Sequence, residues 1–284
     1  MKSVLQMASK IASIPGLNIV SRAANRVPRE QDLVGYLASQ QLAKRAVAEV
    51  AAQIQEGWSE RQAADLLNTC LRDYGVRSFF HQAFVWYGER TRFRGFKTYF
   101  DYLASGRVVR PGDVYILDVA PIVDGYICDI GYTSSLGENI EFAKAEQFLA
   151  RLKDEIPLLF SQARSGADVW NALDDLFHEA GYDNIHAKYP FSVLGHRVHR
   201  VRSETVLPSI INFGWQSYWE FLSRGLFGQL LNQDFHGDLT GLWAIEPHIG
   251  TAQFGAKFEE ILVVENGSAR WLEEQPTTSV RSGN

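Results

Sequence analysis

Two aspartates in the chain could bind a cation together. Asp118 and Asp129 flank Asp124-Gly125, a dipeptide that typically forms a two-residue β-hairpin turn between apolar strands. In this register Asp118 faces Gly131, and the two carboxylates share one face of the hairpin, ~7 Å apart at the backbone. Buried carboxylates repel one another unless a cation neutralises them. The hairpin therefore predicts a metal site.

Three downstream residues could complete a ligand set, because each lies in or beside an apolar, extended run: His196, Glu246 and Glu259. Four carboxylates and one neutral imidazole carry four negative charges, which two divalent ions would balance. Oxygen-rich ligation of this kind suits Mn²⁺, Fe²⁺, Co²⁺ or Zn²⁺. Two such ions ~3.5 to 4 Å apart lower the pKa of a bridging water toward ~7 and polarise a carbonyl group. The set predicts hydrolytic chemistry.

Acid-base and substrate-binding residues can be proposed around this set. Glu246 is a candidate general base, and His248, two residues further along an extended chain, would lie on the same side as a proton carrier. A core histidine bonded to backbone is the alternative for His248. Arg200 and Arg202 lie on the side of His196 if that run is extended, and guanidinium groups bind carboxylates with two parallel hydrogen bonds. His199 is a further substrate-binding candidate, and a solvated basic face is the alternative for the arginines.

The elements that must position these residues follow a repeated order. Apolar spacing predicts helices over 33–55, 59–74, 140–163 and 167–180, with extended segments over 76–87 and 185–194. The second helix begins with Ser59 in a capping-box sequence. Strands are also expected at 257–264 and 269–272, joined by a turn at Asn266-Gly267. The order of two helices, a glycine and a strand occurs twice, which suggests two similar halves that share one sheet. Chance recurrence of a common pattern is the alternative.

Taken in order, these motifs resemble the pita-bread metallopeptidase family, which includes methionine aminopeptidases, Xaa-Pro aminopeptidases, prolidases and creatinases. The resemblance covers roughly residues 35 to 275. It rests on Leu117-Asp118-Val119, Asp129-Ile130-Gly131-Tyr132-Thr133, Gly195-His196, Ile245-Glu246-Pro247 and the run from Phe258 through Glu259 to Gly267. It implies an α+β fold with two pseudo-symmetric halves on a curved, mainly antiparallel sheet, and two divalent metal ions held by the five residues.

Two histidines that family peptidases usually carry are missing from the expected positions. Counting from the metal motifs places Asp101 and Ser203 where substrate-positioning histidines would stand. His81 and His199 lie nearby in sequence and could replace them if a loop differs in length. The leading prediction is therefore a dinuclear metal-dependent hydrolase that cleaves an amide or peptide bond. The alternatives are a non-peptidase metalloenzyme with C–N bond or oxidative chemistry, and an inactive binding protein.

The composition excludes several other classes. With 28 Lys and Arg against 33 Asp and Glu among 284 residues, the chain lacks the basic excess of nucleic-acid binders. The two cysteines cannot build a disulfide framework, and no apolar run is long enough to span a membrane. We expect a cytoplasmic protein with a lead-in segment at 1–33 and one catalytic domain at 34–284. The expected partner is a small peptide or amino-acid-derived molecule, and a homodimer is a candidate assembly.

Overall fold

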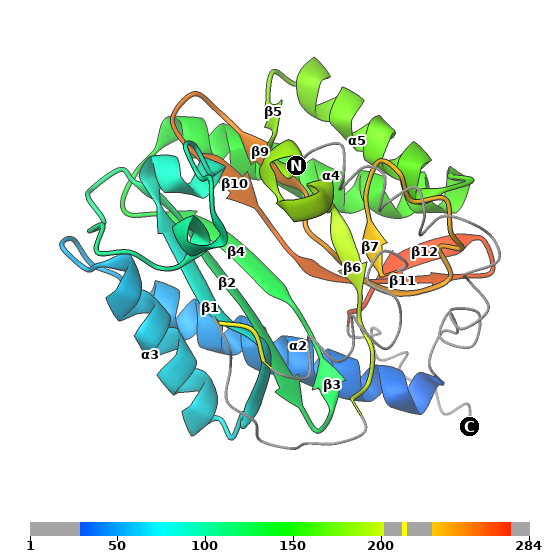
Figure 1. Cartoon of the computed structure of the whole chain (residues 1–284), viewed down its shortest axis with the longest axis horizontal. Helices are drawn as coiled ribbons and strands as arrows, with labels where there is room; N and C mark the ends of the chain where they lie inside the picture. Colours follow the sequence, from blue (N-terminus) through cyan, green and yellow to red (C-terminus); the bar gives the residue numbers. More distant parts are fainter. Residues whose placement is uncertain (1–28, 202–211, 215–228, 274–284) are drawn as a thin grey trace, which may run out of the picture.

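The computed structural model describes residues 29–201, 212–214 and 229–273. Every pairing between the strands in these ranges is antiparallel. The strands form three sheets with the orders β1-β2-β3, with β4 also paired to β2, then β10-β9-β5, and β12-β11-β8-β6-β7. Figure 1 shows the strands in the middle of the molecule, with α2 and α3 on one side and α4 and α5 on the other. No helix in the described ranges is long and apolar enough to cross a membrane.

The first half consists of two helices and a four-stranded sheet. Ser59 caps the second helix with a complete capping box, as the sequence predicted. Gly75, which follows this helix, has a φ of +91°, a conformation that favours glycine. The elements of this half are α2 (Glu30–Ala51), α3 (Glu60–Asp73), β1 (Ser78–Tyr87), β2 (Val114–Val123), β3 (Tyr126–Ile127) and β4 (Ile130–Ser135), with the 3₁₀ turns η3 (Gly88–Arg92) and η4 (Tyr99–Tyr102) after β1.

The second half repeats the order of two helices followed by strands. Asn139 and Ser165 cap its helices by accepting hydrogen bonds from backbone amides. Its elements are α4 (Ile140–Gln162), α5 (Gly166–Glu179), β5 (Asp183–Asn184), β6 (Gly195–Arg197), β7 (Leu230–Leu231), β8 (Gly241–Ile245), β9 (His248–Gly250), β10 (Gly255–Lys257), β11 (Glu260–Glu265) and β12 (Ser268–Trp271), with η5 (Ile185–Lys188) and η6 (Pro190–Ser192) between β5 and β6.

The prediction of an extended segment over 185–194 was wrong. Most of this segment forms the two short 3₁₀ turns, and the side chain of Asn184 caps the first by accepting a hydrogen bond from the amide of His186. Phe191 and Ser192 have positive φ angles of 61° and 51°, which turns the chain away from a strand. Local capping therefore outweighed the apolar pattern.

The hairpin that carries the two aspartates has the predicted register. Val123 pairs with Tyr126, and Asp118 pairs with Gly131. Asp124 and Gly125 both have positive φ, 50° and 81°, as a type I′ turn requires. The turn at Asn266-Gly267, between β11 and β12, has the same conformation.

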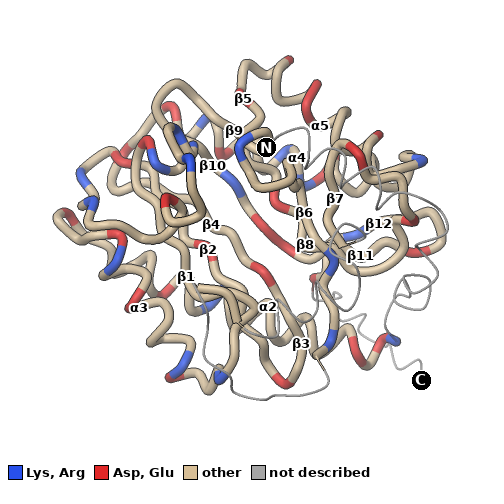
Figure 2. Tube along the Cα trace, viewed as in Figure 1, with Lys and Arg blue, Asp and Glu red and all other residues tan. Residues whose placement is uncertain are grey.

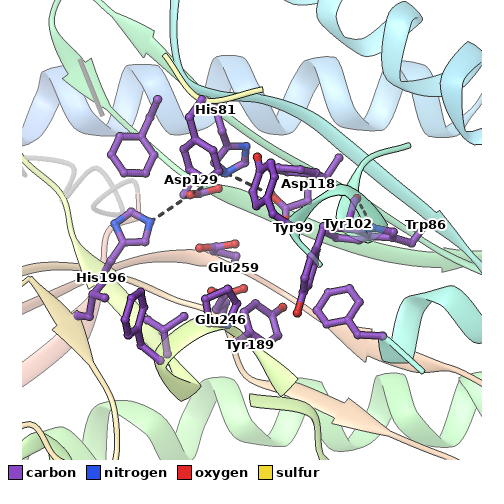
Figure 3. Close-up of a pocket in the computed structure, with 18 residues that line it drawn as sticks. His81, Trp86, Tyr99, Tyr102, Asp118, Asp129, Tyr189, His196, Glu246 and Glu259 are labelled. Atoms are coloured by element: carbon purple, nitrogen blue, oxygen red, sulfur yellow. Dashed lines mark hydrogen bonds and ion pairs between the residues drawn. The ribbon is translucent and has the colours of Figure 1, made fainter. Parts of the chain in front are cut away.

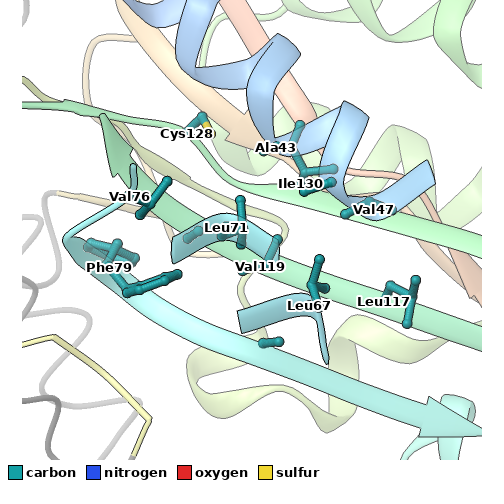
Figure 4. Close-up of a cluster of buried hydrophobic side chains, with 14 of the residues drawn as sticks. Ala43, Val47, Leu67, Leu71, Val76, Phe79, Leu117, Val119, Cys128 and Ile130 are labelled. Atoms are coloured by element: carbon teal, nitrogen blue, oxygen red, sulfur yellow. The ribbon is translucent and has the colours of Figure 1, made fainter. Parts of the chain in front are cut away.

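Hydrophobic packing fixes the hairpin against the first pair of helices. Figure 4 shows Leu117 and Val119 of β2 with side chains of α2 and α3, among them Ala43, Val47 and Leu67. These side chains are at most 1% exposed. Since residues two apart on a strand share a face, the burial of Leu117 and Val119 on one face turns Asp118 to the other. The core thus directs this carboxylate away from the helices.

A β-bridge joins the first sheet to the chain at the start of β11. The amide of Glu259 donates to the carbonyl of Gly131 over 3.0 Å, where the chain leaves β10 and before it enters β11. The strand predicted at 257–264 is therefore interrupted at Phe258 and Glu259, because Glu259 pairs with β4 instead of with β8. This interruption brings Glu259 close to the hairpin.

Candidate metal centre

The five residues predicted as metal ligands lie together. Asp118 comes from β2, Asp129 from the segment between β3 and β4, His196 from β6, Glu246 from the residue after β8, and Glu259 from the residue before β11. All five are between 2% and 7% exposed. Figure 3 shows their side chains directed toward one another between the two halves. Figure 2 likewise shows acidic residues in the central strands as well as on the outside of the molecule.

The spacing of the donor atoms suits metal binding. Ligand atoms of Asp129, His196 and Glu259 lie within 4.8 Å of one another, and so do those of Asp118, Glu246 and Glu259. Asp118 Oδ1 and Asp129 Oδ1 are buried, and neither has a hydrogen-bond partner among the described residues. A buried carboxylate oxygen without a donor is costly, and a divalent cation would remove that cost. The donor set therefore fits the hard or borderline divalent ions expected from the sequence.

Lys257 is a positive charge within this acidic group that the sequence analysis missed. Its Nζ lies 2.6 Å from Asp118 Oδ2, 2.6 Å from Glu246 Oε2 and 3.1 Å from Glu259 Oε2, and the residue is 1% exposed. Burial by itself lowers the pKa of Lys257, but the three carboxylates raise it well above its usual value. Lys257 and Glu259 are two residues apart and so share a face of an extended chain, which is the sequence signal for this contact.

The carboxylates differ in how strongly they hold a proton in the metal-free protein. Burial raises the pKa of Glu259 well above its usual value, and the charges of Asp129 and Glu246 add to this. Burial also raises the pKa of Glu246, although Lys257 opposes the rise. Burial acts in the same direction on Asp129, but His81 and His196 lower its pKa below the usual value. Of Glu246, Glu259 and Asp129, Asp129 is thus the carboxylate best prepared to be ionised.

His81 is a second residue whose position the sequence left open. It comes from β1, and its Nε2 lies 3.1 Å from Asp129 Oδ2 and 3.5 Å from Asp118 Oδ1. Burial lowers the pKa of His81, but the charges of Asp129 and Asp118 raise it to about 9 in the metal-free protein. The signal in the sequence was a lone histidine in the apolar run of β1, which pairs with the strand that carries Asp118.

A cavity of about 240 Å³ opens beside the candidate metal centre. Asp118, Asp129, His196, Glu246 and Glu259 line one part of it. Most of the remaining wall is aromatic: Phe80, Phe84, Trp86, Phe93, Tyr99, Tyr102, Tyr189, Phe191 and Phe213. No lysine or arginine is among the described residues that line it. The cavity is therefore lined by acidic and histidine side chains on one side and by mostly apolar side chains elsewhere.

Comparison with known proteins shows which family the chain belongs to. Residues 35–266 match metallopeptidase family M24. The chain belongs to this family. A methionine aminopeptidase from Archaeoglobus fulgidus is 26% identical to the chain over 145 residues, which is 50% of this chain and 46% of that protein. The chain thus aligns with less than half the length of this relative.

Solved structures share the fold at low sequence identity. An X-Pro aminopeptidase from Thermotoga maritima superposes with a TM-score of 0.67 at 19% identity, covering 90% of this chain and 64% of that one. A prolidase from Pyrococcus furiosus gives 0.64 at 17%, covering 90% and 68%. A methionine aminopeptidase from Rickettsia prowazekii gives 0.56 at 15%, covering 87% and 98%. The predicted α+β pita-bread fold of the M24 family is confirmed.

Two histidines expected from the resemblance to M24 peptidases do not stand at the counted positions. Asp101 accepts hydrogen bonds from the amides of Lys97 and Thr98 and from the Thr98 hydroxyl, so that it caps the turn η4. It does not line the cavity, although its neighbours Tyr99 and Tyr102 do. Ser203 lies outside the described residues.

The predicted catalytic residue His248 lies behind the cavity wall. Its Nδ1 is 2.9 Å from the hydroxyl of Tyr189, a lining residue, and its backbone amide donates to His186. Burial lowers the pKa of His248 well below its usual value, and the charge of Lys257 adds to this. The expectation that His248 itself points to the metals needs correction, because Tyr189 stands between it and the cavity. A role as proton carrier could act only through the Tyr189 hydroxyl and stays a prediction.

The predicted substrate-binding residues do not line the cavity where they are described. Arg200 lies over the Tyr126 ring with its Nη1 3.6 Å from Asp32 Oδ1, and it is exposed. His199 has its Nε2 2.6 Å from Gln229 Oε1. Arg202 lies outside the described residues. A role for these three residues in substrate binding stays a prediction that this placement does not support.

Proposed function

We propose that the protein is a metal-dependent hydrolase that cleaves an amide or peptide bond in a small peptide or an amino-acid-derived molecule. The convergence of Asp118, Asp129, His196, Glu246 and Glu259 at the floor of one cavity carries this proposal. Membership of metallopeptidase family M24 supports it. When bound, two divalent ions of Mn, Fe, Co or Zn would activate a water and polarise the carbonyl group of the substrate.

The charges of the side chains at the site indicate which metal ions and ligands together would balance them. The four carboxylates carry four negative charges when ionised, and Lys257 contributes one positive charge that the sequence-based count left out. Two divalent ions would then exceed the remaining charge by one. One negatively charged group, such as a substrate carboxylate or a hydroxide, would complete the balance. The protein therefore supports two ions together with an anionic ligand.

Glu246 is the residue we propose as general base. It lines the cavity, and one of its oxygens is bonded to Lys257, which fixes the orientation of the carboxylate. In the metal-free protein burial raises the pKa of Glu246, and Lys257 opposes this rise. Lys257 acts here as a positioning residue.

The walls of the cavity favour a substrate with an apolar or aromatic group. The Phe93 ring contacts Trp86 and Tyr102 edge to face, and its centroid lies 4.9 Å from each of theirs. The indole nitrogen of Trp86 is already bonded to the carbonyl of Tyr102, so this ring offers its apolar surface to a ligand. A small acidic substrate, as the basic residues after His196 suggested, would need its carboxylate recognised by the metal ions.

A non-peptidase reaction on the same donor set is the second candidate. The observation in its favour is Asp101, which caps a turn and so offers no imidazole to position a peptide.

Cys70 and Cys128 are buried and form no disulfide, which fits the cytoplasmic setting expected from the sequence. The homodimer also stays a prediction.

Two measurements test the proposal. Protein stripped with a chelator and reloaded with Mn²⁺ or Co²⁺ should bind metal far more tightly than the double variant Asp118→Ala, Asp129→Ala. Equal binding by the two proteins would refute the metal centre. A panel of dipeptides, tripeptides and amino-acid amides then separates the two reactions, because release of N-terminal residues supports the peptidase and its absence, in protein that binds metal, favours the alternative.

A further inference from the structure

Two histidines from opposite halves of the molecule reach the same oxygen atom. His81 Nε2 and His196 Nε2 each lie 3.1 Å from Asp129 Oδ2. Figure 3 shows the two rings on either side of Asp129. Among the predicted ligands only His196 is a histidine, so His81 adds a nitrogen donor that the ligand motifs do not include.

The backbone orients both rings in the same way. His81 Nδ1 lies 3.0 Å from the carbonyl oxygen of Gln82, and His196 Nδ1 lies 3.1 Å from the carbonyl oxygen of Arg197. Since a carbonyl oxygen only accepts, each Nδ1 donates its proton to the next residue of its own strand. Each ring therefore turns Nε2 toward Asp129, and this tautomer is the one that binds metals through Nε2.

The two histidines also hold similar positions on their strands. His81 of β1 pairs with Ala120 of β2, two residues from Asp118. His196 of β6 pairs with Ala244 of β8, two residues from Glu246. In each half, a histidine thus lies on the strand next to the one that leads to an acidic ligand.

The surroundings of His81 supply further donors. Asp118 Oδ1 and Asp129 Oδ1 are both buried and have no hydrogen-bond partner among the described residues, and Asp118 Oδ1 is 3.5 Å from His81 Nε2. One ligand atom from each of His81, Asp118 and Asp129 lies within 4.8 Å of the other two. The remaining oxygen of Asp118 is bonded to Lys257, so its free oxygen is directed to the side of His81.

We propose that His81 is a sixth metal ligand, which binds the ion held between Asp118 and Asp129 as His196 binds the ion held by Asp129 and Glu259. This inference rests on the proposed metal centre. Each of the two ions would then have one imidazole, instead of one ion having an imidazole and the other only oxygen ligands. Because imidazole suits Fe²⁺, Co²⁺ and Zn²⁺ better than Mn²⁺, the second ion should also be selected toward those metals.

The substitution His81→Asn tests this ligand. The Asn side-chain amide can keep the hydrogen bond to the Gln82 carbonyl that Nδ1 makes, but it removes Nε2. His196→Asn is the matched control, because it makes the same change at the histidine of the predicted ligand set. Thermal unfolding of both metal-free variants shows whether they are folded before metal is added.

Zinc content and the X-ray absorption fine structure of the zinc-loaded protein provide readouts that do not depend on activity. The wild type should bind two zinc ions with an average of one imidazole per zinc. His81→Asn should either lose one zinc ion or retain both with half an imidazole per zinc, and its weaker site should bind at least tenfold less tightly. The d–d absorption of the Co²⁺-loaded protein should change in the same variant.

The outcomes separate this inference from the proposed function. If the wild type binds no metal, the proposed metal centre fails and His81 with it. If the wild type binds two ions with half an imidazole per zinc, and His81→Asn leaves content, affinity and spectrum unchanged, the metal centre stands and the role of His81 is refuted. If His81→Asn does not fold, the imidazole count of the wild-type protein still decides the question.

Discussion

Replacing Lys257 with methionine tests how the acidic site is held together without metal. Methionine preserves most of the apolar stem, but it leaves Asp118, Glu246 and Glu259 without the ammonium group that lies 2.6 to 3.1 Å from them. Removal of one partner from a buried charge network costs about 3 to 5 kcal/mol, because the remaining charges stay buried without compensation. The free energy of unfolding of the metal-free variant should fall by that amount at pH 8.

The loss should depend on pH and on metal. A carboxyl group whose pKa is higher in the folded than in the unfolded protein contributes stability at low pH and loses it as the pH rises through the folded value. Burial raises the pKa of Glu246 and of Glu259 in this direction, and removal of Lys257 would raise both further. The deficit of the variant should therefore be largest at pH 8 and smaller at pH 5. Saturating Mn²⁺ should also reduce it, since a divalent ion supplies positive charge.

Urea unfolding followed by tryptophan fluorescence, with a chelator or with Mn²⁺, measures these differences. Lys44→Met is the matched control, because Lys44 is 41% exposed at its side chain and Glu260 has Lys153 as a second partner. This control should lose no more than about 1 kcal/mol. If Lys257→Met is as stable as the control in chelator, or if its deficit is the same at pH 5 and pH 8, Lys257 does not hold the metal-free site together by its charge.

Three other predictions concern single positions. Glu260→Gln should lower the free energy of unfolding by about 2 kcal/mol at pH 7. Lys44 and Lys153 lower the pKa of the buried Glu260 carboxyl. The difference from wild type should therefore vanish as the pH falls well below 4.5. Burial lowers the pKa of His186 to about 3. The free energy of unfolding of the wild type should therefore fall by up to about 1.4 kcal/mol per pH unit below pH 6.5. If His186→Gln shows the same dependence of the urea midpoint on pH as the wild type, this prediction is contradicted. Gly131→Ala would place its Cβ 3.0 Å from the Cβ of the metal ligand Glu259. This variant should bind Co²⁺ at least tenfold more weakly in a titration. Gly106→Ala is the control, because Gly106 has open space around it, and it should bind Co²⁺ as the wild type does.

Local rules were sufficient to predict the hairpin and the ends of several helices. The Asp124-Gly125 turn fixes the register in which Asp118 faces Gly131, and the structure has this register. The capping box at Ser59 and the turn at Asn266-Gly267 were likewise predictable, because each depends on residues within a few positions of one another.

The convergence of residues far apart in the chain needed information that no local rule contains. The resemblance to a known family supplied it for the five predicted ligands, but it could not supply His81 or Lys257, which the ligand motifs do not include. Lys257 reaches Asp118 across 139 positions because Glu259 leaves its sheet to pair with Gly131. The place of His248 behind the cavity wall was not predicted, because Tyr189, which bonds to His248, lies between η5 and η6 in a segment predicted as extended.

Anomalous diffraction from crystals of the protein loaded with Mn²⁺ or Zn²⁺ would locate the metal ions themselves. We expect two anomalous peaks ~3.5 to 4 Å apart. They should lie within bonding distance of Asp118, Asp129, His196, Glu246 and Glu259. Peaks that lie elsewhere, or none at this cluster under conditions in which the protein binds metal in solution, would contradict the proposed metal centre.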